Sequence, residues 1–139
     1  MDPNLEREIE IYIDGLDRMS TSEAGNVISM LECKFVKDTD CLWWWTGLKS
    51  IKQRIDYGNG VSWPTIQELL IGYGDEYYLV ISDDEPSPWP VFRGSLQAIG
   101  KLLSNLWRVE YFITDAQLRV IVFDTHHNEI VVSENSRVE

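Results

Sequence analysis

Residues 118–124 constrain the fold more than any other part of this sequence. Alternate residues of an extended strand point to opposite faces, so a strand with one exposed face alternates between apolar and polar residues. Here both faces are apolar, with Leu118, Val120 and Val122 on one side and Ile121 and Phe123 on the other. The segment therefore predicts a central strand that is covered on both sides, or at least partly so.

Other strand-like segments surround this one. Strands are predicted at residues 110–114 and 129–132, and the connections at 115–117 and 125–128 are too short for a crossover helix. We therefore expect consecutive antiparallel hairpins. A further strand is predicted at residues 77–81, which combine aromatic and branched aliphatic side chains.

Apolar residues at helical spacing predict helices in four places. The first helix follows Pro3, the second begins at an N-cap in the Ser20–Ser22 segment, and the two are expected to form an antiparallel pair. A short helix is predicted to open with the capping-box pattern of residues 65–68, and another to follow Ser95. The predicted fold class is α+β, with N-terminal helices packed on an antiparallel sheet of about four strands and one inserted helix.

Residues 33–63 are the least readable part of the chain, and two interpretations stay open. Residues 41–45 fit a short strand, whereas Leu48, Ile51 and Ile55 are spaced as one face of a helix. The whole chain, 1–139, is expected to be a single domain, with 133–139 as a frayed tail.

The charge of the chain bears on its partners. Asp and Glu number 23 against 12 Lys and Arg, which gives a net charge of −11. Such a chain repels phosphate backbones and anionic bilayers, so we expect neither nucleic acid nor a membrane as its partner. It attracts basic proteins, and its six tryptophans are the residue type that most often anchors a protein interface.

The sequence has no apolar run long enough to cross a bilayer and no pattern of an export signal near its start. We therefore expect a cytoplasmic protein in which Cys33 and Cys41 are reduced thiols.

Two segments are the candidate partner-binding residues. The first choice is the acidic, proline-bearing segment that contains Asp83, Asp84, Glu85 and Trp89, although a plain solvated loop is the simpler interpretation. The second is the tryptophan run Trp43, Trp44 and Trp45, of which at least one ring should reach a surface, unless all three serve the core.

His126 and His127 are the only histidines, and they lie where one predicted strand turns into the next. Neighbouring strand residues point apart unless the turn bends them together, and further ligands are lacking, so we expect no metal here. The pair is expected to be structural or to make a secondary partner contact. We find no signature of a catalytic nucleophile or a phosphate-binding loop, and therefore expect a protein that is not an enzyme and has no cofactor.

The order of motifs carries a resemblance. Four motifs of this chain resemble, in their order, those of a family of small, mostly uncharacterised bacterial proteins. They are Trp44-Trp45 with Leu48-Lys49, the run from Trp89 to Phe92, the run from Glu110 to Ile113, and His126-His127-Asn128. That family resembles the immunity proteins of toxin systems. This chain differs from its pattern at Asn128, where the family tends to have Asp, and no family active site carries over.

The leading hypothesis is an immunity protein (antitoxin) that neutralises a basic toxin, such as a nuclease, by covering its active site. A regulatory or scaffold domain that binds another protein is the first alternative. A small hydrolase that uses His126 or His127 with an acidic partner is the second.

Overall fold

The computed structural model describes residues 2–41, 43–83, 88–106 and 109–135. In this part of the chain one antiparallel sheet has the strand order β1-β4-β3-β5-β6-β7-β2. The strands are β1 Leu16–Arg18, β2 Gln53–Asp56, β3 Tyr77–Ile81, β4 Val91–Gly94, β5 Tyr111–Asp115, β6 Val120–Asp124 and β7 Glu129–Glu134. The helices are α1 Pro3–Tyr12, α2 Thr21–Phe35, α3 Trp63–Leu70 and α4 Leu96–Ser104, with a 3-10 turn, η1, at Trp44–Thr46.

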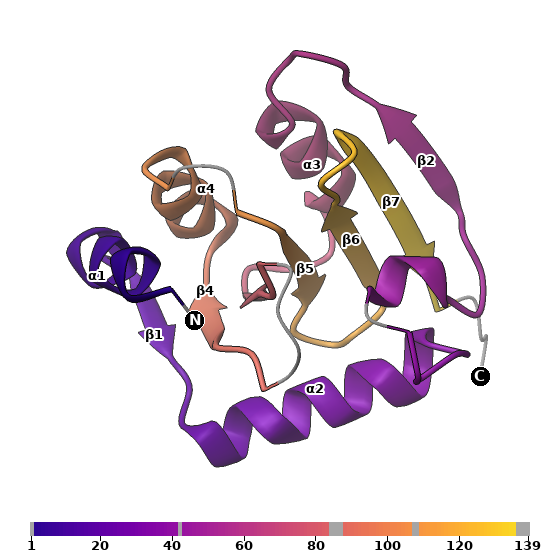
Figure 1. Cartoon of the computed structure of the whole chain (residues 1–139), viewed down its shortest axis with the longest axis horizontal. Helices are drawn as coiled ribbons and strands as arrows, with labels where there is room; N and C mark the ends of the chain where they lie inside the picture. The colour runs from indigo at the N-terminus through magenta and orange to yellow at the C-terminus, as the bar shows by residue number, and fades with distance from the viewer. Residues whose placement is uncertain (1, 42, 84–87, 107–108, 136–139) are drawn as a thin grey trace.

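The sheet lies between two layers (Figure 1). Buried residues of α1, α3 and α4 pack with one set of strand side chains, and those of α2 and η1 pack with the alternate set. In β6, Val120 and Val122 belong to the first core, whereas Ile121 and Phe123 belong to the second. The predicted central strand with both faces covered is therefore confirmed, as are the hairpins that join β5, β6 and β7.

Leu118 is an exception to the predicted face. It precedes β6 with a φ of 56°, in the left-handed region, and it packs in the α2 core rather than beside Val120 and Val122. The turn residue has thus left the alternation of the strand. Strand periodicity holds only where the backbone is extended.

The α+β class is confirmed, but the expected four strands are too few and the expected helix pair is wrong. The first helix stops at Tyr12, and Gly15, with a φ of 86°, turns the chain into β1. This strand carries the chain past the edge of the sheet, so α1 and α2 cover opposite faces. The short edge strands β1 and β2 and the strand β4 bear polar residues or glycine, which weakens their strand pattern.

The helix starts are predicted with mixed success. Ser20 caps α2 through a complete capping box with Glu23, and Ser95 caps α4 by accepting a hydrogen bond from the Ala98 N–H. In contrast, α3 begins before the Thr65 capping pattern, at Trp63. Within residues 33–63, η1 forms where residues 41–45 were expected to be a strand. The alternative, a helix through Leu48, Ile51 and Ile55, is wrong because residues 53–56 form β2.

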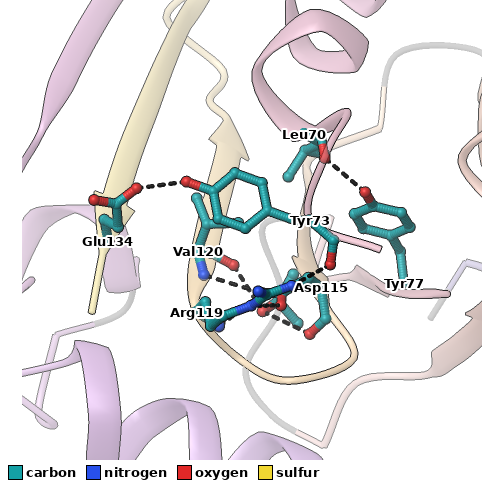
Figure 2. Close-up of polar contacts among 8 residues, drawn as sticks. Leu70, Tyr73, Tyr77, Asp115, Arg119, Val120 and Glu134 are labelled. Atoms are coloured by element: carbon teal, nitrogen blue, oxygen red, sulfur yellow. Dashed lines mark hydrogen bonds and ion pairs between the residues drawn. The ribbon is translucent and has the colours of Figure 1, made fainter. Parts of the chain in front are cut away.

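A polar network holds the β5–β6 turn against the connection that follows α3 (Figure 2). The buried carboxylate of Asp115 accepts hydrogen bonds from the backbone N–H groups of Arg119 and Val120 and from Arg119 Nε, at 2.7, 3.0 and 2.9 Å. Arg119 also donates to the carbonyl oxygen of Tyr73. The Tyr73 hydroxyl in turn donates to Glu134 Oε2 at 2.5 Å, and this bond raises the pKa of Tyr73 to about 12.

Candidate functional site

An open pocket of about 780 Å³ lies where four connections meet. They are the loop between β2 and α3, the start of the connection after β3, the segment that leads from α4 into β5, and the turn between β6 and β7. The described side chains and backbone that line it are those of residues 57–62, Asp83, Leu106, Val109, Glu110, residues 124–126 and Asn128. None of these lining residues is a lysine or an arginine.

Asp124 ends β6 at the pocket wall, and its side chain is largely buried, with the residue 8% exposed. Its two carboxylate oxygens each accept one hydroxyl hydrogen, Oδ1 from Tyr57 at 2.5 Å and Oδ2 from Ser62 at 2.6 Å. Burial and the Asp124 carboxylate raise the pKa of the neighbouring Tyr111 phenol. The hydrogen bonds fix the loop before α3 onto the end of the sheet.

Glu110 immediately precedes β5 and is 7% exposed. Its Oε2 lies 2.7 Å from His126 Nδ1 and accepts the backbone N–H of His126 at 2.9 Å. An ionised Glu110 can only accept, so Nδ1 carries the proton and Nε2 is the basic nitrogen of the neutral ring. Within the described residues, Glu110 Oε1 has no hydrogen-bond partner.

His126 also belongs to a group of rings beside the pocket, which we call the ring cluster: Trp43, Trp45, His126 and His127. The ring centroid of His126 lies 4.8 Å from that of Trp43 and 5.5 Å from that of Trp45. The Trp43 and Trp45 rings are stacked at 5.9 Å, and His127 meets Trp45 edge-on at 5.6 Å. Two candidate segments that the sequence treats separately therefore form one surface feature.

The two histidines do not point apart as neighbouring strand residues would, because the turn bends them together, which is the exception that the sequence leaves open. Their ring centroids are 4.1 Å from each other, because both residues lie in the turn after β6 rather than in the strand. A turn bends successive side chains together, whereas a strand separates them. Among the described residues, no group of three or more His, Cys, Asp or Glu side chains is arranged to hold a metal ion.

The other predicted contact residues fall in different places. Trp89 is 7% exposed and packs edge-on against Trp44 at 5.2 Å and against Phe112 at 5.7 Å, so it lies in the α2 core rather than on the surface. Trp44 and Trp45 are buried as well, and Trp43 is the half-buried member of the run. Trp43 is therefore the ring of the run that reaches the surface.

The structure describes Asp83 of the acidic segment. Asp83 lines the pocket and follows β3 with a φ of 41°. Asp84 and Glu85 lie outside the described residues.

The sequence reasoning missed Glu110, Asp124 and Val61. Both carboxylates adjoin strands that are otherwise apolar, and an acidic residue at such a position was the available signal. Val61 is an aliphatic residue in a glycine-rich loop, and it is 76% exposed at the edge of the pocket. Its exposure is visible only in the structure.

A second hollow, of about 520 Å³, lies between α2 and residues 88–90. Its lining includes Arg18 and Glu6, which form a bidentate ion pair: Arg18 Nη1 and Nη2 donate to the two carboxylate oxygens of Glu6 at 2.8 and 2.9 Å. These charges compensate each other, so the first pocket is the stronger candidate for a charged ligand.

Comparisons with family models, with curated proteins and with solved structures find no match to this chain. Across the described residues, no helix has the length and apolar character needed to span a bilayer.

Proposed function

We propose that this chain is an immunity protein (antitoxin) that binds a basic toxin domain through the pocket and the neighbouring ring cluster, and so covers the active site of the toxin. The observation that carries the proposal is a pocket with two buried carboxylates, Glu110 and Asp124, and no lysine or arginine among its described lining residues. The motif resemblance described above supplies the toxin as the class of partner.

The electrostatics support a basic partner. A net charge of −11 attracts positively charged proteins over long range, and attraction of this kind raises the rate of encounter. Active sites that hold phosphate groups are positively charged, so an acidic surface complements them. The two free cysteines, Cys33 and Cys41, suit the reducing cytoplasm in which we place the complex.

The shape of the surface also supports a protein partner. Interfaces combine a desolvated centre with aromatic and aliphatic contacts around it. Here Val61 is exposed on one rim of the pocket, and the ring cluster adjoins the pocket at His126. Trp89, as a core residue, has no place in this contact set.

A growth-protection assay tests the proposal. The genes next to that of this chain are cloned first. Where one encodes a basic toxin domain, co-expression of the chain should restore growth and yield a stoichiometric complex by size-exclusion chromatography. Val61→Arg should abolish protection, because it places a cation against a basic partner. Ile71→Arg is the matched control, since Ile71 is 69% exposed and does not line the pocket.

Equal protection by the two variants would mean that this face is not the contact surface. Failure of the unaltered chain to protect against that toxin would refute the immunity function itself. Tight binding to a basic protein that is not a toxin would instead favour the regulatory or scaffold alternative.

One observation favours a hydrolase as the second candidate function. The Glu110 carboxylate orients His126 through Nδ1, which leaves Nε2 to take a proton from water at the edge of a pocket. If this function is correct, the purified chain should hydrolyse neutral or cationic esters, and His126→Ala should remove the activity. A wild-type rate equal to that of His126→Ala would exclude it.

A further inference from the structure

We propose that the pocket binds the guanidinium group of an arginine side chain that the protein partner inserts. This inference rests on the proposed function, because it assumes that the pocket face is the contact surface. It names the chemical group that the pocket recognises.

The first argument is the charge of the pocket wall. Glu110 and Asp124 are both more than nine-tenths buried, and burying a carboxylate is costly unless it is paired or hydrogen-bonded. Asp124 is satisfied by two neutral hydroxyl groups, and Glu110 by His126. Neither has a lysine or arginine partner within the described residues. A cation in the pocket would supply a positive charge that no described lining residue provides.

The second argument is the unused oxygen of Glu110. The two hydrogen bonds to this carboxylate both end on Oε2, and Oε1 has no partner in the described part of the chain. Among the described residues the one fully buried side-chain N or O atom without a partner is Trp45 Nε1, so Glu110 Oε1 is accessible and can accept a hydrogen bond from a ligand in the pocket. This observation is independent of the net charge.

The third argument is that the side-chain donors beside the two carboxylates are already used. The hydroxyl hydrogens of Tyr57 and Ser62 are already committed to Asp124, and His126 donates its Nδ1 proton to Glu110. These groups therefore have no further hydrogen to give, and Nε2 of a neutral His126 accepts. A ligand that reaches these two carboxylates must therefore bring its own hydrogen-bond donors. Guanidinium, with five N–H donors and no acceptor, fits this description.

The fourth argument separates arginine from lysine. His126 lines the pocket, and its ring is tilted against that of Trp43 next to the pocket, with centroids 4.8 Å apart. A planar guanidinium stacks on aromatic faces and also forms paired hydrogen bonds to a carboxylate, whereas an ammonium is a compact, strongly hydrated charge. We therefore expect arginine to bind more tightly than lysine.

The test uses the isolated full chain and small probes. N-acetyl-arginine methylamide is titrated while the ring resonances of His126 and Trp43 are followed by NMR, and the citrulline and lysine analogues are titrated in parallel. Citrulline keeps the shape of the side chain but carries no charge. The expected result is saturable shifts at both rings with arginine, weaker binding of lysine and none of citrulline. Equal shifts with arginine and citrulline, or none with arginine, would overturn the inference.

A pair of variants locates the contact. Glu110→Gln keeps an acceptor for His126 but puts an amide group in place of the charged oxygen, and it should weaken arginine binding by about tenfold or more. Glu68→Gln removes the same charge from an exposed position on α3, and it should change binding by no more than about twofold. Equal effects of the two variants would mean that only net charge matters, and the pocket inference would be wrong.

The probe experiment and the growth-protection assay fail separately. If the chain protects against the toxin but does not bind the arginine probe, the guanidinium inference is wrong and the proposed function stands. If it binds arginine in the pocket but protects against no toxin, the pocket inference stands and the proposed function fails.

Discussion

The imidazole of His126 lies with Nδ1 2.7 Å from Oε2 of the buried Glu110. This contact fixes the turn between β6 and β7 to the residue that precedes β5, and it therefore links the two ends of the β5–β6 hairpin. The same ring also contacts Trp43 and Trp45 of the ring cluster. A single side chain thus joins the acidic pocket to the aromatic surface.

Removing that side chain should destabilise the fold. His126→Ala leaves Glu110 with its backbone hydrogen bond only, and the loss of a hydrogen bond to a buried charged group costs about 1–3 kcal/mol. The free energy of unfolding, measured with urea, should fall by that amount. The matched control is His127→Ala, which removes an exposed imidazole that pairs with no carboxylate among the described residues. A loss no greater than that of His127→Ala would show that the contact between His126 and Glu110 adds nothing to stability.

Two glycines within helices should respond in opposite ways to alanine. A Cβ on Gly100 of α4 would lie 2.5 Å from ring atoms of Trp63, so Gly100→Ala forces the indole to move. Overpacking costs about 1–3 kcal/mol, which exceeds the gain of about 1 kcal/mol in helix propensity. A Cβ on Gly25 of α2 meets nothing within 4 Å, so Gly25→Ala should stabilise the fold by about 0.5–1 kcal/mol. Thermal unfolding of both variants checks the sign, and a stabilising Gly100→Ala would contradict the packing described here.

The central part of the fold was predictable because its signals are local. The apolar strands β3, β5, β6 and β7, the short turns between them and the caps at Ser20 and Ser95 all follow from neighbouring residues. The edge strands were not, because β2 is exposed along most of its length and β1 is short. Such strands form only because a neighbouring strand offers them hydrogen bonds, and sequence periodicity does not record that.

The candidate site was predictable in its parts and not in its assembly. His126, His127 and Trp43 stand out in the sequence by residue type, yet their contact depends on a turn that brings neighbouring residues together. Glu110 and Asp124 become noticeable only when the sheet places them on the same pocket. The role of a tryptophan also depends on its burial, which composition does not show. Trp89 was expected on a contact surface, and it lies in the core.

Trp89→Ala should therefore act on folding. Replacing a buried tryptophan by alanine costs about 3–5 kcal/mol, since the cavity is refilled only in part. The Trp89 ring contacts both Trp44 and Phe112, so the α2 core should loosen. Near-ultraviolet circular dichroism and urea unfolding measure the change, with the half-buried Trp43→Ala as the control that should cost less. A Trp89→Ala protein of unchanged stability would return this residue to the list of surface anchors.

The bond between Tyr73 and Glu134 predicts a loss of stability at high pH. It raises the pKa of Tyr73 from the ordinary tyrosine value of 10.0 to about 12, so the protonated phenol is favoured in the folded state. The stabilisation is complete below the unfolded pKa and disappears as the pH rises through the folded pKa. The stability difference between the unaltered chain and Tyr73→Phe should shrink across that alkaline window.

Tyrosinate absorbance provides the direct check. The difference between the titration of the unaltered chain and that of Tyr73→Phe isolates this residue, and its midpoint should lie near 12. The same bond lowers the pKa of Glu134, and the hydrogen bond from Lys52 lowers it to a smaller extent. This second contribution is present above the unfolded pKa of the carboxyl group and is lost as the pH falls through the folded value. A midpoint at the ordinary tyrosine value would show that the bond does not persist in solution.

The last prediction concerns how the chain meets a basic partner. If long-range charge guides the encounter, added salt should slow association steeply and change dissociation little, because attraction is screened over about 8 Å at physiological ionic strength. Neutralising Asp83, Asp84 and Glu85 together should slow association further, since Asp83 borders the pocket. Surface plasmon resonance at several salt concentrations measures both rates. The control neutralises Glu8, Glu10 and Asp14, which remove the same charge but do not line the pocket. An association rate that responds equally to both triple variants would make the net charge responsible for the attraction. A rate indifferent to salt would show that the charge serves solubility and does not guide binding.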